Sequence, residues 1–233
     1  MTKTIVAVAT AMILLSFQAT NQASAADPPY RWIEVTGKAE FMPRDGAGAL
    51  SFKNRMFLLG GWNPSPTYRE FFPLICNNEV WSSIDGKKWT LEKPNTFKDR
   101  TFDTTSDWEG RHTAGYAVFK DKMWIVGGDA NQRHYQNDVW NSSDGKKWNL
   151  IAKDQQLPWA PRVLHYTVVH KGAIWVIGGQ TMPGFAGADE AFYRDIWRTE
   201  DGKSWEQIKP QGDYWSPRGM IGGSAVMNGR IWI

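Results

Sequence analysis

The sequence predicts an all-β fold made of repeated four-stranded sheets, and three observations lead to this expectation. Nearly the same fourteen-residue string occurs three times, at 79–92, 138–151 and 195–208. Apolar runs that end in Gly-Gly also occur three times, at 56–61, 123–128 and 174–179. The spacing inside each copy is constant, whereas the spacing between some segments varies. Four-stranded units that recur about every 50 residues are typical of the blades of a β-propeller.

The chain begins with a segment that differs from the rest. Lys3 precedes a mostly apolar stretch at 5–17, and the small residues Ala-Ser-Ala follow at 23–25. This order is typical of a secretory signal peptide, here over residues 1–25. The apolar stretch is shorter than the roughly 20 residues of a membrane-spanning helix. The sequence therefore predicts a secreted or periplasmic protein that has no membrane span once the signal is removed.

Residues 30–36 are expected to form a strand ahead of the first complete blade. The string YRWIEV at 30–35 resembles the last strand of a blade, yet no other blade strands precede it. Such a strand would complete the final blade and close the ring, which removes exposed sheet edges. Because the sequence ends inside the fourth copy, we expect an incomplete fragment of about three and a half blades.

Each blade is expected to hold four strands, a to d, joined by short turns. An Arg precedes Gly-Gly by 16 residues in three copies, and two Trp residues lie eight residues apart in three copies. Constant spacing of this kind indicates hairpins of fixed register. We place an a–b turn at Lys120-Asp121, and we expect Asp-Gly at 144–145 to supply the positive φ angles of a c–d turn. The blades are predicted at 44–93, 111–152, 162–209 and, truncated, 218–233.

The abundance of Trp fits this arrangement. The sequence holds 14 Trp residues, and 13 of them recur at equivalent blade positions. We therefore expect Trp to pack within and between blades, with only Trp62 outside the pattern.

The composition argues against several kinds of partner and cofactor. The net charge is +3, but Lys residues are scattered or paired, so we expect no nucleic-acid partner. Cys76 is the only cysteine and cannot form a disulfide within the chain. The four His residues show no metal-binding spacing. His112 and His165 enter inner strands near the channel, but we expect no metal and no cofactor.

These features resemble the kelch repeats of β-propellers, the group that includes the central domain of galactose oxidase, and in particular exported bacterial members. The resemblance covers about residues 30–233 and rests on Gly-Gly, the Asp/Glu-Val/Ile-Trp triplet, the second Trp and the Arg that leads into the next blade. It implies a kelch-type β-propeller of four-stranded blades. The turn at 83–89 also resembles the Asp-box of sialidases, S-x-D-x-G-x-x-W, but it is one residue short. Gly-Gly favours the kelch alternative.

The topology of such a blade predicts where a site should lie. The a–b and c–d turns of an up-and-down blade lie at one end, and the b–c and d–a connections lie at the other. Here the turns are short and constant, whereas the connections are long and variable, and loops of this kind carry function. The working face is therefore predicted from six segments: 62–78, 93–110, 129–137, 153–161, 180–194 and 210–217.

Two groups of residues are candidates for ligand binding at this face. The first group is an arginine at the start of each inner strand, which could ring the channel mouth and bind carboxylates or polyols: Arg44, Arg111, Arg162 and Arg218. Alternatively, each Arg caps the backbone of the neighbouring blade. The second group combines aromatic and polar side chains in the b–c connections: Trp62, Arg133, His134, Tyr135 and Tyr193.

The sequence favours a binding function over an enzymatic one. It combines a regular scaffold with variable loops, and no catalytic set can be identified at fixed spacing. We therefore expect a secreted or periplasmic binding module for a carbohydrate or protein partner. The alternative is a carbohydrate-active enzyme on the same scaffold, because the sequence also resembles sialic acid mutarotases and copper-dependent oxidases of the galactose oxidase type. The second of these would require copper ligands and a Cys–Tyr cross-link, for which Cys76 is the sole thiol.

Overall fold

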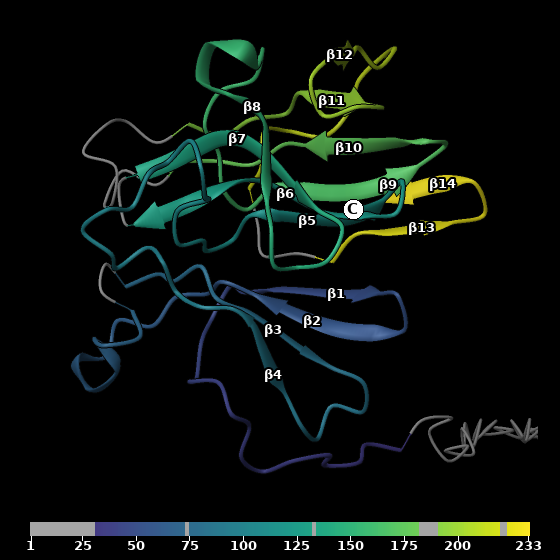
Figure 1. Cartoon of the computed structure of the whole chain (residues 1–233). Helices are drawn as coiled ribbons and strands as arrows, with labels where there is room; N and C mark the ends of the chain where they lie inside the picture. Colours follow the sequence, from purple (N-terminus) through teal and green to yellow (C-terminus); the bar gives the residue numbers. More distant parts are fainter. Residues whose placement is uncertain (1–30, 73–74, 132–133, 182–190, 220–222) are drawn as a thin grey trace, which may run out of the picture. The chain divides into compact units, whose positions relative to one another are not determined.

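A computed structural model describes residues 31–72, 75–131, 134–181, 191–219 and 223–233 (Figure 1). The chain divides into two units, Met1–Glu34 and Val35–Ile233, and the second contains all the described strands. No helix in the described ranges is long and apolar enough to cross a membrane. The predicted signal peptide at 1–25 lies outside the described residues.

The described strands form a continuous series along the second unit. They are β1 (Gly48–Phe52), β2 (Arg55–Leu59), β3 (Val80–Ser83), β4 (Thr90–Lys93), β5 (Gly115–Phe119), β6 (Lys122–Asn131), β7 (His134–Ser142), β8 (Asn149–Lys153), β9 (Tyr166–His170), β10 (Ala173–Ile177), β11 (Ile196–Thr199), β12 (Trp205–Ile208), β13 (Ala225–Met227) and β14 (Arg230–Trp232). Two short 3-10 helices accompany them, η1 (Pro66–Tyr68) and η2 (Asp154–Gln156).

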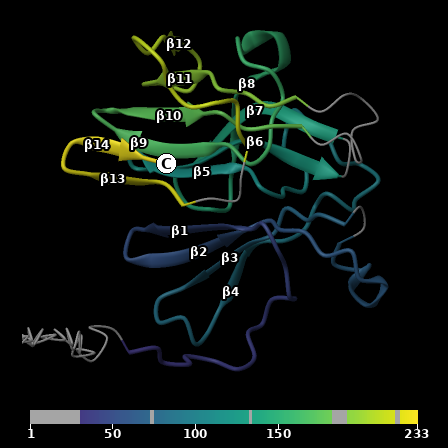
Figure 2. The same cartoon turned by 180° about the vertical axis from the view of Figure 1, so that it is seen from behind.

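The strands form separate antiparallel sheets, each ordered as the chain runs. Three sheets have four strands, in the orders β1-β2-β3-β4, β5-β6-β7-β8 and β9-β10-β11-β12, and β13 pairs with β14 alone. We call these blades 1 to 4. The all-β fold predicted from the repeats is confirmed, with three four-stranded blades and the first hairpin of a fourth. The β1–β2, β9–β10 and β13–β14 turns lie at the same end, on the right in Figure 1 and on the left in Figure 2.

The predicted strand over 30–36 is not observed, because residues 31–36 carry no regular secondary structure. A strand requires a neighbour that takes up its backbone hydrogen bonds. No ladder within the described ranges includes this segment, and the Trp32 side chain is 98% exposed.

The a–b turns are two-residue hairpins. Phe119 pairs with Lys122 across the turn, so that only Lys120 and Asp121 connect β5 to β6. Both residues have positive φ angles, 48° and 55°. This is the left-handed geometry that matches the twist of the flanking strands, and the predicted turn at Lys120-Asp121 is confirmed.

The c–d turns use Asp-Gly differently from the expectation. In the turn of blade 1 only Gly86 is left-handed, with a φ of 73°. The Asp85 carboxylate instead accepts the backbone N–H groups of Lys87 and Lys88 at 2.9 and 3.2 Å. These hydrogen bonds hold the pKa of Asp85 below its usual value. The aspartate therefore serves as a side-chain acceptor that closes the turn.

Backbone hydrogen bonds join neighbouring blades at the end where the connections lie. The second Gly of each Gly-Gly donates to the carbonyl of the Arg that opens the next blade: Gly61 to Arg111 at 2.7 Å, Gly128 to Arg162 at 2.9 Å and Gly179 to Arg218 at 2.8 Å. Gly128 has a φ of 101°, and a Cβ there would lie 2.6 Å from the Cβ of Ala114. Only glycine combines a favourable positive φ angle with the absence of a Cβ atom, and both are needed at this contact between blades.

Apolar side chains fill the space between neighbouring blades. One cluster joins blades 1 and 2 around Phe57, Trp108 and Trp140, and another joins blades 2 and 3 around Trp124 and Trp159. The Trp108 ring packs edge-on against Trp148, and the Trp159 ring packs edge-on against Trp205. The expectation that Trp packs within and between blades is met at these positions.

Candidate functional site

Three of the four predicted arginines are buried in ion pairs inside their own blades. The guanidinium of Arg44 lies 2.8 Å from Glu79 Oε2 and donates to the Gly60 carbonyl at 2.9 Å. Arg111 lies 2.8 Å from Asp138 Oδ2, and its side chain is fully buried. Glu79 directly precedes β3 and Asp138 lies within β7, so each pair ties the start of its blade to the third strand.

Arg162 makes the same connection in blade 3 with better geometry. Its two terminal nitrogens lie 2.6 and 2.9 Å from the two oxygens of Asp195, a bidentate pair. Arg218 is partly exposed and donates through Nε to the Ser216 carbonyl at 3.3 Å. It forms no ion pair with any described residue.

The structure therefore corrects the predicted ring of free arginines. The side chains of Arg44, Arg111 and Arg162 are at most 2% exposed, so a ligand at the surface cannot reach their donors. The alternative prediction also changes, because the backbone carbonyls of Arg111, Arg162 and Arg218, and not their side chains, bond to the neighbouring blade. Burial of the guanidinium groups in blades 1 to 3 is stable because an acid in each of these blades compensates the charge.

The inner rim carries a polar cluster that includes one predicted residue. We call Asp45, Trp62, His112 and Asp129 the inner-rim cluster. His112 Nδ1 lies 2.9 Å from Asp129 Oδ1, and Nε2 lies 3.9 Å from Asp45 Oδ2. The His112 ring lies over the Trp62 ring, with centroids 5.5 Å apart and planes inclined by 31°.

The chemistry of this cluster follows from the bond between His112 and Asp129. An ionised carboxylate only accepts hydrogen bonds, so the proton of a neutral imidazole sits on Nδ1. His112 Nε2 is then the nitrogen that can exchange a proton with a bound hydroxyl group. Asp129 thereby holds the His112 ring in one tautomer and one orientation.

The other candidates that the structure describes, His134, Tyr193 and Tyr135, lie outside the inner-rim cluster as defined above. His134 Nε2 lies 3.2 Å from both carboxylate oxygens of Glu109, and this hydrogen bond raises the pKa of His134. The Arg162 guanidinium lies 4.3 Å from the centre of the Tyr193 ring, and burial raises the pKa of Tyr193. Tyr135 lies partly buried in β7. Arg133 lies outside the described residues.

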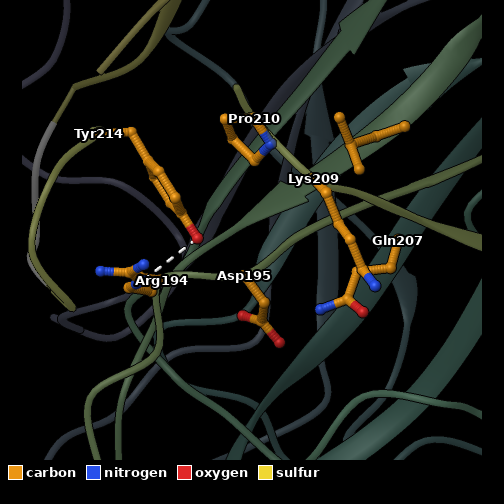
Figure 3. A pocket seen from close by; sticks show the side chains of 7 residues that line it. Arg194, Asp195, Gln207, Lys209, Pro210 and Tyr214 are labelled. Carbon is orange, nitrogen blue, oxygen red and sulfur yellow. Dashed lines mark hydrogen bonds between the residues drawn. The ribbon is translucent and has the colours of Figure 1, made fainter. Parts of the chain in front are cut away.

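A pocket in blade 3 is lined by residues that the sequence analysis did not select. Its volume is about 420 Å³, and its walls come from three segments (Figure 3). The end of the b–c connection contributes Arg194 and Asp195, and β12 contributes Gln207 and Ile208. The d–a connection contributes the rest: Lys209, Pro210 and Tyr214. Both kinds of connection thus meet here, as expected of the working face.

Some polar side chains of the pocket already have hydrogen-bond or ion-pair partners within the protein, and others have none among the described residues. Arg194 lies 4.4 Å over the Tyr214 ring and donates through Nε to the Tyr214 hydroxyl at 3.1 Å. Asp195 is paired with Arg162 and also accepts from Trp197 Nε1 at 2.7 Å. In Figure 3, Arg194 and Tyr214 lie on one side of Asp195, and Gln207 and Lys209 lie on the other.

Gln207 and Lys209 are therefore the free polar groups of this pocket. Both are exposed, and neither side chain bonds to another residue in the described part of the chain. An amide and an ammonium group without protein partners are suited to a ligand's oxygen atoms.

A hollow of similar size at the opposite end is less suited to a ligand. Its volume is about 400 Å³, and it is lined by Phe52, Arg55, Glu92, Lys146 and neighbouring residues. Arg55 and Lys146 lie 3.1 and 3.5 Å from the Glu92 carboxylate. The cations of this hollow are already matched within the protein.

Comparison with known proteins supports the fold. No protein-family model matches the chain. A solved structure described as "Structure of YjhT" is similar, with a TM-score of 0.58 and 16% sequence identity over 80% of this chain and 59% of that chain. The chain thus spans about three fifths of the YjhT chain. At this level of identity the likeness concerns the fold alone, and together with the four-stranded antiparallel sheets it supports a kelch-like β-propeller scaffold.

Proposed function

We propose that this chain is an exported binding module that recognises carbohydrate through the end of the blades where the b–c and d–a connections lie. The observation that carries this proposal is the blade 3 pocket, which both connections form together. Its volume of about 420 Å³ lies within the roughly 300–1,000 Å³ range of small-molecule sites.

The lining of the pocket suits a saccharide. The partly exposed Tyr214 ring offers an apolar face to the C–H groups of a sugar, and its orientation is held by Arg194. Gln207 and Lys209 can bond to hydroxyl oxygens, since neither is used within the protein. A protein partner would instead require a larger continuous surface, and it is the alternative outcome of the test below.

The test is a glycan array probed with the full chain, followed by titration of the best ligand. We expect binding that Tyr214→Ala weakens at least about tenfold, because a stacking surface is lost. Ile84→Ala is the matched control, since this exposed side chain lies in a c–d turn. If no glycan binds while the folded chain captures a protein partner, the carbohydrate assignment is overturned.

Export is proposed from the first 25 residues, whose composition is that of a signal peptide. Expression of the full chain in a bacterial host should give a periplasmic or secreted product that begins at Ala26. Amino-terminal sequencing checks this prediction. A cytoplasmic product that retains Met1 would contradict it.

A second candidate function is favoured by the bond between His112 and Asp129. A base that exchanges protons with a sugar hydroxyl could convert one anomer into the other, as the resemblance to sialic acid mutarotases implies. NMR exchange measurements on N-acetylneuraminate test this function, and His112→Asn should abolish the effect. No group of three or more His, Cys, Asp or Glu side chains that could hold a metal ion is found among the described residues.

A further inference from the structure

The blade 3 pocket exists where blade 3 departs from its own repeat. Three positions, counted along the sequence from the acid and the Trp residues of the repeat, differ between the blades. The residue before the acid of the strand c triplet is Asn78, Asn137 or Arg194. The fourth residue after the second Trp is Lys93, Ala152 or Lys209, and the residue before the third Trp is Asp107, Pro158 or Tyr214.

In blade 1 these positions close the junction between strand c and the d–a connection. Asn78 Nδ2 donates to the Trp108 carbonyl at 2.7 Å, and Asn78 Oδ1 accepts the Thr96 N–H at 2.9 Å. The Lys93 ammonium is 2.7 Å from Asp107 Oδ2 and is almost fully buried. Every charge at this junction therefore has a protein partner.

Blade 2 closes the same junction without charges. Asn137 Nδ2 donates to the carbonyls of Asp154 and Trp159, both at 3.2 Å. Ala152 takes the place of the lysine and is buried in the core between blades 2 and 3. A ligand could enter neither junction without breaking these contacts.

Blade 3 also has a lysine at this count, Lys209, but not the acid. Because β11 and β12 pair without the bulge found in blades 1 and 2, Ile208 and not Lys209 lies opposite Ile196. Arg194 replaces the asparagine and cannot accept a hydrogen bond, whereas Tyr214 replaces the aspartate and carries no charge. Lys209 is left exposed without an ion pair among the described residues. Among the described residues that line the pocket, Asp195 is the only carboxylate, and it is already matched by Arg162. The described lining therefore carries an excess of positive charge.

We propose that this pocket binds an acidic saccharide, with the carboxylate of a uronate between Arg194 and Lys209. The guanidinium suits a planar carboxylate because its donors form a fork, and the ammonium adds a second point charge. Gln207 and the Tyr214 ring then contact the sugar itself. This inference rests on the proposed carbohydrate function and names the class of ligand.

The test compares D-glucuronate, D-glucose and acetate by calorimetric titration of the full chain at low salt. The first two probes differ only at the carboxylate carbon, and acetate carries the carboxylate without the sugar. We expect glucuronate to bind at least about tenfold more tightly than either of the others. Raising the NaCl concentration should weaken binding because salt screens exposed charges.

Two variants examine the assignment of residues. Lys209→Gln should weaken glucuronate binding about tenfold or more, since a charge-assisted contact is lost. The double variant Arg194→Asn/Tyr214→Asp rebuilds the blade 1 pattern and gives Lys209 an acid partner. It should abolish glucuronate binding without lowering the melting temperature. Lys203→Gln, at an exposed turn position of the same blade, is the control and should bind as the wild type does.

The outcomes separate this inference from the proposed function. If neutral glycans bind and glucuronate gives no advantage, the inference fails and the carbohydrate function stands. If acetate binds as well as glucuronate, only the carboxylate is recognised and the saccharide assignment is overturned. If no saccharide binds the folded chain, the proposed function fails and the inference fails with it.

Discussion

The two ends of the blades follow different rules. At the end that carries the c–d turns, three blades repeat the same hydrogen bonds: the Gly N–H donates to the side-chain oxygen of Ser83, Ser142 or Thr199, at 2.8 Å in each. At the other end, blades 1 and 2 share only the hydrogen bond from Asn78 or Asn137 to the carbonyl of the third Trp, and the described remainder of each junction differs. The comparison teaches that locally closed turns constrain sequence tightly. At the other end, buried ion pairs and backbone hydrogen bonds hold the strands, so the sequence of the neighbouring connections can vary.

The largest expected effect concerns the ion pairs that allow this freedom. Arg111→Met leaves the buried Asp138 carboxylate without its counter-ion, so the free energy of unfolding should fall by about 3–5 kcal/mol. Urea unfolding followed by Trp fluorescence measures the loss. Arg218→Met is the control, and it should cost less than about 0.5 kcal/mol because no ion pair is broken. Equal effects of the two substitutions would mean that the buried pair does not hold the blade.

The next effect concerns the turn end. Asp144→Ala removes the acceptor of two backbone N–H groups, which it binds at 2.8 and 3.0 Å, and should cost about 1 kcal/mol. Asp213→Ala, an exposed aspartate of the d–a connection, should leave the unfolding midpoint unchanged. If the two aspartates behave alike, the turns do not owe their repeated sequence to these hydrogen bonds.

A smaller effect should follow pH at the end that carries the connections. The His134 pKa is raised, chiefly by the hydrogen bond with Glu109, so this contact stabilises the fold fully below the unfolded pKa of about 6.5. The stabilisation is lost as pH rises through the folded pKa. It should stay below about 1 kcal/mol because the His134 side chain is 59% exposed, so that water screens the pair.

The measurement compares the unfolding midpoints of the wild type and His134→Gln between pH 5.5 and 8.5. The difference between the two proteins should shrink as pH rises, and it should also shrink on addition of NaCl. A difference that grows with pH would show that the pair does not act through the charged imidazole.

The smallest effect is expected at the blade 3 pocket. Lys209→Gln should change the free energy of unfolding by less than about 0.5 kcal/mol, because the side chain has no partner in the described protein to lose. Lys93→Gln, at the same sequence count in blade 1, should cost more than about 1 kcal/mol, because Asp107 then loses its partner. If both substitutions lower the free energy of unfolding by similar amounts, the junction of blade 3 is not more open than that of blade 1.

The sequence predicted the blades because their register depends on short-range spacing. The turn at Lys120-Asp121 and the strands beside it lie where constant spacing placed them. Short-range spacing could not predict reliably whether a strand forms at 30–36, since a strand there needs a partner that is distant in the sequence. Residues 31–36 are described without one.

The candidate site was predicted only as a set of connections. The ion pair between Arg111 and Asp138 was not predicted, although an Arg and an acid recur in each of the first three blades. The pocket escaped selection because three segments must fold together before Arg194, Lys209 and Tyr214 become neighbours. The signal that could have found it is the asparagine of two blades that becomes an arginine in the third.

The joint between blades is made of main-chain atoms, from the second Gly N–H to the Arg carbonyl ahead. Substitutions elsewhere in a blade leave both atoms in place as long as the glycine is kept. A duplicated blade therefore arrives with the donor for its successor and the acceptor for its predecessor already present. The number of blades can therefore change by whole units, and the connections of a new blade can vary in sequence and bind a different ligand.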